Sequence, residues 1–332
     1  MFDHQIAVTG ANGFVGRALC DELESRGFTV RRLVRSASSD LKLVPVGDIN
    51  ANTNWVRALE GVSTVLHCAA RVHVMSDEGR DALDEYRMVN VEGTRRLAEQ
   101  AALQGVKRLI FISTVKVNGE STCNVLRSFQ AEGAFTPFDP PNPQGPYAVS
   151  KWEAEQALWK VCEKNDLDIV IVRLPLVYGP GVRANFLRLI KLVQLGWPLP
   201  FGMAKNRRSL VSLDNLVDLL ICCVHHPAAV GQTFLVSDGM DLSTKQLVKS
   251  LILELNAEIL RAARNKKVKI YNPIFFPVPV WLLLMAGRIL GRQAEIERLF
   301  GTLRVDITHT CKTLGWNPPI SINEGLRRTL TK

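Results

Sequence analysis

The sequence lacks the motifs that define several classes of protein. Its seven cysteines form no CxxC pair and have no regular spacing, so we expect reduced thiols in a cytosol and no disulfide framework. Its six histidines include no HExxH or other metal-binding spacing, and we therefore predict no metal site. The apolar run at 6–8 is too short for a signal peptide, so the sequence favours a cytoplasmic protein.

Long hydrophobic runs are also missing. The strongest membrane candidate, 274–290, contains two prolines and Arg288, and its unbroken apolar part is far shorter than the roughly 20 residues that span a bilayer. We therefore expect no transmembrane segment. We interpret this stretch as a helix that starts near Pro279 and packs into a domain or against a partner, with a peripheral membrane contact as the minor alternative.

The composition is that of a folded protein with an excess of positive charge. Of its 332 residues 47% are hydrophobic, which excludes a mainly disordered chain. The net charge of +9 comes from 41 lysines and arginines against 32 acidic residues, and the basic residues do not form one block. Because no basic module with interleaved aromatic residues is present, we expect a solvated surface and no nucleic-acid partner.

Strand and helix patterns alternate through the first half of the chain. The predicted strands lie at 5–9, 29–34, 42–46, 64–68, 108–113 and 169–173, and the predicted helices at 17–26, 81–104 and 147–163. Strands that alternate with helices form crossover units. The predicted fold class is therefore α/β, with a doubly wound parallel sheet covered by helices on both faces.

Prolines interrupt this alternation after Arg173. A helix at 215–224 and a strand near 233–236 then lead back to the sheet, and the remainder is mostly helical. We predict a larger lobe made of 1–175 and 209–238, and a smaller, mostly helical substrate lobe made of 176–208 and 239–332. Sheets of this kind bind ligands between the lobes, at the carboxyl ends of the strands.

A glycine-rich turn follows the first strand and opens the first helix. The stretch GANGFVG places Gly10, Gly13 and Gly16 in GxxGxxG spacing around Phe14 and Val15. Glycine permits the tight turn and the close approach of a pyrophosphate, whose charge then lies at the helix amino terminus. The sequence therefore predicts that the larger lobe binds a dinucleotide.

Arginine lies at the end of the second strand, where an acidic residue is typical of NAD binding. Arg35 follows this strand, and Arg31 and Arg32 lie within it. A carboxylate would repel the 2′-phosphate of NADP, whereas a guanidinium binds that phosphate with charge-assisted hydrogen bonds. We therefore favour NADP(H) as the cofactor, with NAD(H) as the alternative, in which the arginines are merely exposed.

Residues after the third and fourth strands fit the rest of the cofactor. Asp48 and Ile49 lie where a carboxylate can accept a hydrogen bond from the adenine amino group, although Asp48 would equally cap a helix. Cys68 and Ala69 supply small side chains where a backbone passes close to a dinucleotide. Packing alone would also explain these small residues.

Tyr147 and Lys151 form a YxxxK pair on the predicted helix at 147–163. Four-residue spacing puts the phenol and the ammonium on one helix face. A phenol with a pKa of about 10 is a poor base near neutrality, but an ammonium and a cationic nicotinamide favour its anion and make it a usable acid/base at a sugar hydroxyl or carbonyl. A hydroxyl that orients the substrate oxygen should follow the fifth strand, where Ser113 and Thr114 lie.

These motifs together resemble the extended short-chain dehydrogenase/reductase superfamily, and within it the nucleotide-sugar epimerases, dehydratases and reductases. The sequences RLP at 173–175, VYGPG at 177–181 and LGWNP at 314–318 extend the resemblance over almost the whole chain. The resemblance implies a Rossmann lobe and a nucleoside-diphosphate sugar, expected to be a UDP-sugar, in the second lobe. It also implies a homodimer, because the helices at 81–104 and 147–163 commonly form the dimer face in similar proteins.

The resemblance also assigns roles to single residues. It implies that Thr114, Tyr147 and Lys151 are catalytic. It further implies that Asn185 and Arg208, the latter in competition with Arg207, hold the diphosphate of the sugar nucleotide, and a bidentate arginine contact suits a diphosphate.

Two departures from the family patterns bear on the reaction. The 4,6-dehydratases carry an Asp-Glu pair after the catalytic threonine, where this sequence has Val115 and Lys116, so we expect no dehydration. Many 4-epimerases hold NAD tightly, with an acid after the second strand and a VYG sequence after the Ser/Thr. This sequence has Arg35 and VNGE at 117–120 instead.

The run STVKVNGE at 113–120 looks most like bacterial 4-ketoreductases that act on UDP-2-acetamido-2,6-dideoxy-hexos-4-uloses for lipopolysaccharide O-antigen. The resemblance implies, in the bacterial cytoplasm, hydride transfer from NADPH to the C4 ketone while Tyr147 protonates O4. Lys116 and Asn118 are candidate contacts to the sugar, or else exposed residues. The alternatives are an NAD-dependent UDP-hexose 4-epimerase and a non-catalytic dinucleotide-binding protein.

Overall fold

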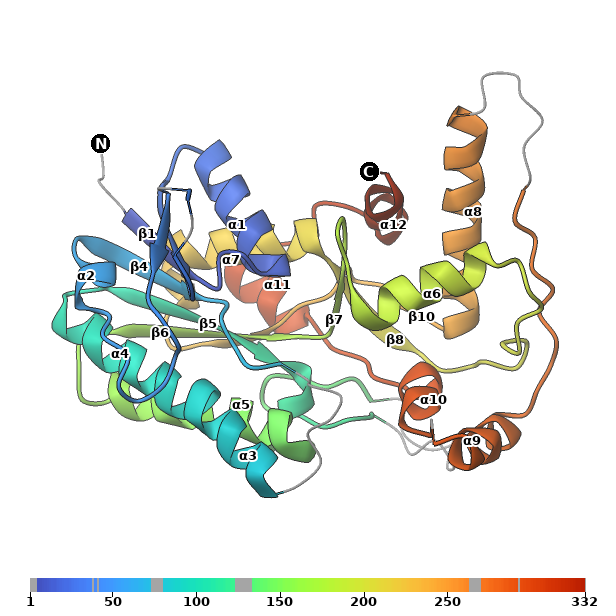
Figure 1. Cartoon of the computed structure of the whole chain (residues 1–332), viewed down its shortest axis with the longest axis horizontal. Helices are drawn as coiled ribbons and strands as arrows, with labels where there is room; N and C mark the ends of the chain where they lie inside the picture. The colour runs from blue at the N-terminus through green and yellow to red at the C-terminus, as the bar shows by residue number, and fades with distance from the viewer. Residues whose placement is uncertain are drawn as a thin grey trace.

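A parallel β-sheet forms from the strands that alternate with helices along the first 235 residues. The computed structural model describes residues 5–37, 39–40, 42–72, 80–122, 133–262, 270–291 and 293–331. Within these residues the sheet has seven strands in the order β3-β2-β1-β4-β5-β6-β9, and every neighbouring pair is parallel (Figure 1). The strands are β1 (Gln5–Thr9), β2 (Thr29–Val34), β3 (Leu43–Pro45), β4 (Val62–His67), β5 (Arg108–Thr114), β6 (Asp168–Leu174) and β9 (Thr233–Leu235).

Both faces of this sheet are buried, which explains the apolar runs of its strands. In β1, Ile6 and Val8 belong to the core on one face, while Ala7 belongs to the core on the other. In β5, Ile110 and Phe111 divide in the same way. Since successive side chains of a strand point to opposite faces, a strand buried on both sides needs apolar residues at successive positions. The predicted α/β class is confirmed.

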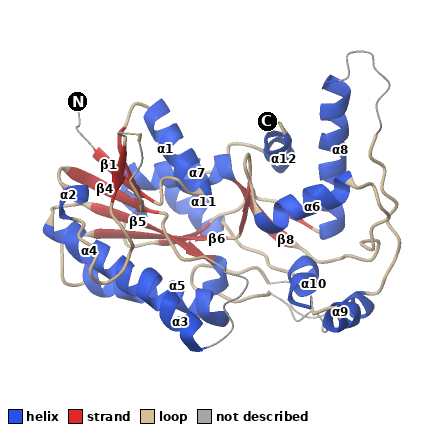
Figure 2. Ribbon diagram, viewed as in Figure 1, coloured by secondary structure: helices blue, strands red, loops and turns tan. Residues whose placement is uncertain are grey.

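Helices cover the two faces of the sheet (Figure 2). The first face carries α1 (Phe14–Ser25), α7 (Leu213–His225) and α11 (Thr308–Leu314), and the second carries α2 (Val56–Leu59), α4 (Gly93–Leu103) and α5 (Gly145–Cys162). Leu19 and Leu23 of α1 are fully buried on the first face, as are Ala154 and Leu158 of α5 on the second. The helices predicted at 17–26 and 147–163 are confirmed, and each begins two or three residues earlier than expected.

One π-helical turn interrupts the helix predicted at 81–104. Helix α3 (Arg80–Tyr86) continues through this turn, η1 (Arg87–Glu92), into α4. The buried side chain of Asn90 in the turn accepts a hydrogen bond from Arg71 N at 2.8 Å and donates to Arg71 O and Ser150 Oγ, each at 3.0 Å. These bonds join η1 to the residues after β4 and to α5, and such turns are frequent at functional sites.

A second, smaller sheet lies beyond the carboxyl end of β6 and was not predicted. Its described strands, in the order β10-β8-β7, are β7 (Leu176–Tyr178), β8 (Arg208–Ser212) and β10 (Asp241–Leu242). Its apolar core is shared by α6 (Ala184–Gln194), α8 (Thr244–Ala262), α9 (Val280–Ile289), α10 (Gln293–Phe300) and α12 (Ile322–Leu330). Strands of two to five residues are too short to give a clear alternation, so the sequence predicted only a mostly helical region. The lobe boundaries stay a prediction.

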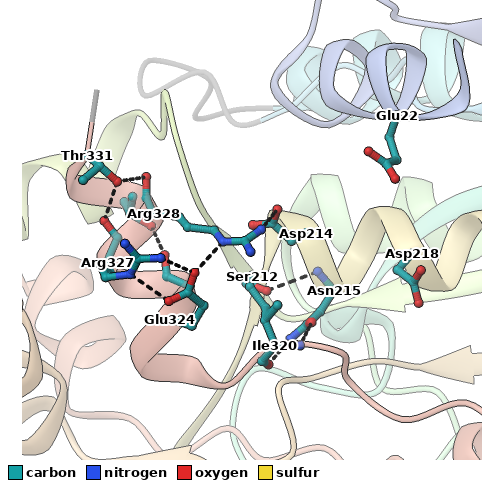
Figure 3. Close-up of polar contacts among 12 residues, drawn as sticks. Glu22, Ser212, Asp214, Asn215, Asp218, Ile320, Glu324, Arg327, Arg328 and Thr331 are labelled. Carbon is teal, nitrogen blue, oxygen red and sulfur yellow. Dashed lines mark hydrogen bonds and ion pairs between the residues drawn. The ribbon is translucent and has the colours of Figure 1, made fainter. Parts of the chain in front are cut away.

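Residues 316–328 pack against the junction of β8 and α7 (Figure 3). Asn215, buried in the first turn of α7, donates to Ile320 O and accepts from Ile320 N, each at 3.0 Å. Arg328 of α12 donates to Asp214 at 2.8 Å. Trp316, between α11 and α12, is buried in the core on the first face of the larger sheet. Residues more than 100 positions later in the chain therefore complete the packing around α7.

A buried ion pair joins α5 to β6. Glu155 is 0% and Arg173 4% exposed, and Arg173 Nη2 donates to Glu155 Oε2 at 2.6 Å. Ser113 Oγ also donates to Glu155, and Arg173 Nη1 donates to Asn118 Oδ1 at 3.0 Å. The pair therefore fixes the end of β5, and the residues that follow it, against α5.

We expect Glu155→Gln to lower the free energy of unfolding by about 3 kcal/mol, because Arg173 then stays buried without its counter-charge. Chemical denaturation of the purified protein measures this loss. Glu22→Gln is the matched control, since it removes the carboxylate of an exposed ion pair with Arg26 and should lower stability by less than about 1 kcal/mol. Equal losses in the two variants would contradict the prediction.

Candidate active site

The glycine-rich turn leaves the amino terminus of α1 open. Gly10 has a φ of 64°, in the left-handed region, and a Cβ on it would lie 3.0 Å from the backbone that follows β4. A Cβ on Gly16 would lie 2.3 Å from Gly10 O. In the described part of the chain no side chain caps α1 at Gly13, and the first turn, which begins with Phe14 and Val15, contains no acidic residue. Its N–H groups and positive dipole end therefore fit the pyrophosphate of a dinucleotide.

A buried polar network holds the backbone beside this turn. Thr9 Oγ1 accepts a hydrogen bond from Ala69 N at 3.1 Å and lies 2.7 Å from His67 Nδ1, while His67 Nε2 lies 3.0 Å from Thr94 Oγ1. Burial, helped by the charge of Lys151, lowers the pKa of His67 to about 3, so this imidazole is neutral. This network was not predicted. Its only local signal is that β1 ends in a threonine and β4 in a histidine.

Arg35 and Asp48 meet at the ends of β2 and β3. Arg35 Nε lies 3.3 Å from Asp48 Oδ1, and the two side chains are 78% and 79% exposed. Arg31 instead donates to backbone carbonyls at 57–60, and Arg32 pairs with acidic side chains of α1. Of these three arginines, Arg35 is therefore the one whose guanidinium faces solvent.

The other two residues predicted on the cofactor side, Ile49 and Ala69, lie next to glycines. A Cβ on Gly93 would lie 2.4 Å from Ile49 Cγ2, so Ile49 packs closely against the start of α4. The backbone N of Ala69 is the atom that a Cβ on Gly10 would meet at 3.0 Å. The structure thus brings Ala69 to the glycine-rich turn and Ile49 to the start of α4.

Tyr147 lies in the first turn of α5, which begins at Gly145 and Pro146. Its side chain is half-buried, and its ring meets the Tyr86 ring edge-on with the centroids 6.1 Å apart. Burial, with a smaller effect of Tyr86, raises the pKa of Tyr147 to about 12. The phenol therefore keeps its proton at neutral pH until a positive charge comes close.

Lys151 lies one turn after Tyr147 and is only 2% exposed. Its Nζ donates to Ile112 O of β5 at 2.6 Å and lies 3.8 Å from the centre of the Phe111 ring. No carboxylate of the described residues forms an ion pair with it. Burial, opposed weakly by the charge of Glu155, lowers the pKa of Lys151 to about 7.

Thr114 ends β5, two residues beyond the carbonyl that Lys151 binds. Its Oγ1 accepts a hydrogen bond from Lys116 N at 3.3 Å, at the start of the short 3-10 turn η2 (Val115–Val117). Ser113 Oγ donates to the buried carboxylate of Glu155. Of the two hydroxyls singled out in the sequence, Ser113 is therefore held in the core, which leaves Thr114 as the candidate for a substrate contact.

Lys116 and Asn118, the predicted sugar contacts, both have protein partners. Lys116 Nζ donates to Glu120 at 2.6 Å. Asn118 is 3% exposed, and its amide accepts from Arg173 at 3.0 Å and donates to Thr136 O at 2.9 Å. Asn118 therefore positions the residues after β5, and contact of either side chain with a sugar stays a prediction.

Arg208, predicted to bind the diphosphate, is the first residue of β8 and half-buried. Its guanidinium forms no hydrogen bond to another described residue, and burial, opposed by the charge of Glu120, lowers its pKa. Arg207 beside it is exposed. Asn185 lies in the first turn of α6, and its side chain is outside the described residues.

A glycine-rich turn at the start of α1 and a tyrosine–lysine pair on α5, joined to a parallel seven-stranded sheet, define an NAD(P)-dependent oxidoreductase of the extended short-chain dehydrogenase/reductase type. More narrowly, the model of the NAD dependent epimerase/dehydratase family matches residues 6–237. The chain belongs to this family.

Relatives and solved structures match nearly the full length. The chain is 44% identical to a UDP-glucose 4-epimerase of Vibrio cholerae, over 98% of this chain and 94% of the relative. It is 27% identical to an N-acetyl-alpha-D-glucosaminyl-diphospho-ditrans,octacis-undecaprenol 4-epimerase of Escherichia coli O157:H7, again over 98% and 94%. A UDP-glucuronic acid 4-epimerase from Bacillus cereus, in complex with UDP-glucuronic acid and NAD, superposes with a TM-score of 0.70 and 22% identity over 98% and 97%. At this identity the structural similarity shows the fold alone.

The pH dependence of stability should report the burial of Lys151. Its pKa of about 7 lies below the ordinary value of 10.5, so between these pH values the unfolded chain binds more protons and folding stability decreases as the pH falls. Lys151→Met removes this group. The free energy of unfolding of the wild type, relative to the variant, should fall by about 2 kcal/mol from pH 9 to pH 7. Denaturant unfolding of cofactor-free protein measures this, and a difference that does not change with pH would refute the prediction.

Proposed function

We propose that this protein is a UDP-hexose 4-epimerase that uses bound NAD. The observation that carries the proposal is the placement of Tyr147 and Lys151 on α5 against the end of β5 that carries Thr114. A phenol beside a buried ammonium can move a proton on a sugar hydroxyl. The Vibrio cholerae relative, at 44% identity over nearly the full chain, supports C4 epimerisation as the reaction.

The cofactor fits the residues that surround the glycine-rich turn. The open amino terminus of α1 receives the pyrophosphate, and Ala69 lets the dinucleotide pass close to the backbone. The carboxylate of Asp48, exposed at the end of β3, can bind the adenosine part. Lys151 binds the ribose hydroxyls of the nicotinamide nucleoside with the N–H groups that Ile112 O leaves free.

Catalysis then requires one group that accepts and returns a proton, and two groups that orient the reactants. Bound NAD supplies a hydride acceptor for sugar C4 and, in its oxidised form, a positive ring charge. Tyr147 Oη takes the proton of the sugar 4-hydroxyl and later returns it to O4, while Thr114 Oγ1 holds O4 by a hydrogen bond. Because burial alone keeps Tyr147 protonated, the phenolate forms only when Lys151 and the oxidised cofactor place positive charge beside it.

The sugar nucleotide is held in the smaller lobe. Arg208 presents a half-buried guanidinium without a hydrogen-bond partner among the described residues, which suits one face of a diphosphate. Asn185, in the first turn of α6, stays the sequence's candidate for a second contact to the diphosphate. Binding through the diphosphate leaves the sugar ring free to present either face of C4 to the cofactor.

Tyr147→Phe should lower turnover by about 10³-fold, because it removes the atom that carries the proton while leaving the ring in place. Binding of NAD, followed by protein fluorescence, should stay nearly unchanged. Tyr86→Phe is the matched control, since it removes a phenol hydroxyl from the neighbouring ring and should keep most of the activity. Retained activity in Tyr147→Phe would contradict the proposed mechanism.

A second function, NADPH-dependent 4-ketoreduction of a UDP-4-keto-6-deoxy-N-acetylhexosamine for surface polysaccharide, is favoured by one observation. Arg35 lies at the end of β2 with its guanidinium exposed, where it can bind a 2′-phosphate. Asp48 opposes this preference, because its carboxylate is only 3.3 Å from Arg35 Nε and would repel that phosphate. A reductase must exchange its cofactor after each turnover, whereas an epimerase reduces what it has just oxidised.

The assay that separates the two functions uses the purified protein without added cofactor. We expect it to interconvert UDP-glucose and UDP-galactose, or their N-acetylated counterparts, with cofactor that it carries. Net consumption of one NADPH per UDP-4-keto-6-deoxy-N-acetylhexosamine, with no epimerisation, would establish the reductase instead. Absence of both reactions would leave only a dinucleotide-binding role.

A further inference from the structure

Helix α9 (Val280–Ile289) has two apolar faces, and one of them is packed in the protein. Val280 and Leu283 pack against the core around the smaller sheet. Gly287 lies against α10, where a Cβ on it would come within 2.5 Å of Ile296 Cδ1. This face follows the spacing i, i+3, i+7 of a helix that contacts its neighbour along its full length.

The opposite face of α9 is apolar and exposed. Trp281, Met285 and Ile289 recur at every fourth position and are 54%, 55% and 82% exposed. Leu282 lies beside them at 42%, and Leu290 follows the helix at 73%. Soluble proteins rarely leave so many large apolar side chains on one short surface, and such a patch marks a site of interaction.

The chain that leads into α9 continues this surface. Ile270, Ile274 and Phe276 are also exposed, at 52%, 70% and 40%. Figure 1 shows this segment running along the outer edge of the smaller lobe to α9, at the end of the molecule away from β1 and α2. We call residues 270–290 the apolar edge. Figure 1 shows α9 well apart from the start of α1, and the apolar edge takes no part in the proposed reaction.

The charge of this region indicates what the apolar edge contacts. Residues 259–294 contain seven lysines and arginines and no aspartate or glutamate. Two members of this set are described, and both are exposed. Arg261 pairs with Glu258 of α8 at 3.2 Å, whereas Arg288 lies on α9 between Met285 and Ile289. A surface that combines tryptophan and aliphatic side chains with a net positive charge matches a bilayer with anionic headgroups, where each nearby basic residue strengthens binding by about fivefold.

We propose that the apolar edge docks on the surface of an anionic lipid bilayer, with Trp281, Met285 and Ile289 inserted at the boundary between headgroups and acyl chains. Within the described residues no helix is long and apolar enough to cross a membrane, so the contact is peripheral. A protein partner fits less well, because a protein interface with this much positive charge needs acidic residues opposite each basic one. The proposal is independent of the reaction, and its failure would leave the epimerase assay unaffected.

The test uses the purified full-length protein and sedimented vesicles. The protein should co-sediment with vesicles that contain phosphatidylglycerol, and little of it should co-sediment with vesicles of phosphatidylcholine alone. High salt should release the protein from the anionic vesicles. Met285→Glu with Ile289→Glu should weaken binding by at least about tenfold. Trp281→Ser, a milder change, should weaken it in the same direction, and both variants should keep turnover of a UDP-sugar in solution.

Leu103→Glu is the matched control, because Leu103 is a 78% exposed leucine at the end of α4 on the other lobe. This variant should bind vesicles like the wild type. No binding by the wild type, or equal loss in the Leu103 variant, would overturn the proposal. A wild type that forms larger oligomers in size-exclusion chromatography, which the α9 variants abolish without any vesicle binding, would assign the apolar edge to a second copy of the chain.

Discussion

The position of α5 against β5 and β6 determines the whole site, and the ion pair of Glu155 with Arg173 holds it there. Two charges removed from water are costly unless further polar groups meet them, and Ser113 and Asn118 do so here. Lys151 lies one turn before Glu155, and Tyr147 two turns before it. The pair therefore fixes the phenol and the ammonium relative to Thr114 at the end of β5.

Electrostatics at the site are unfavourable until ligands bind. Burial disfavours the anion of Tyr147 and the cation of Lys151 alike, and it keeps His67 neutral. Arg208 adds a half-buried guanidinium with no hydrogen-bond partner among the described residues. A positively charged nicotinamide would favour the Tyr147 anion, and a negatively charged diphosphate would pair with the Arg208 guanidinium, so the ligands would offset part of the cost of these buried groups. Binding sites commonly show such a trade between stability and activity.

The larger sheet could be predicted because its strands are buried on both faces and therefore form apolar runs. The glycine-rich turn and the Tyr147–Lys151 pair could be predicted because their residues are close together in the sequence. The smaller sheet could not be predicted, since its strands are too short to show an alternation of apolar and polar residues. The pairs Asn90–Ser150 and Glu155–Arg173 lie 60 and 18 positions apart and meet only in the fold. Arg35 and Asp48 were both visible in the sequence, but their pairing was not, so NADP was favoured from Arg35 without the carboxylate that lies 3.3 Å from it. The same catalytic groups serve reduction and epimerisation, which is why the motifs favoured a reductase where the 44% identical relative is an epimerase.

The packing of residues 314–328 around α7 has a consequence for folding during synthesis. Leu314 and Trp316 fill the core on the first face of the larger sheet, and α11 covers that face. A ribosome that has finished β9 needs several more seconds of synthesis, at about 5–20 residues per second, before Leu314 and Trp316 can dock. During that interval the part of this apolar face that these residues cover stays exposed on the nascent chain, so the core on the first face is completed late in synthesis.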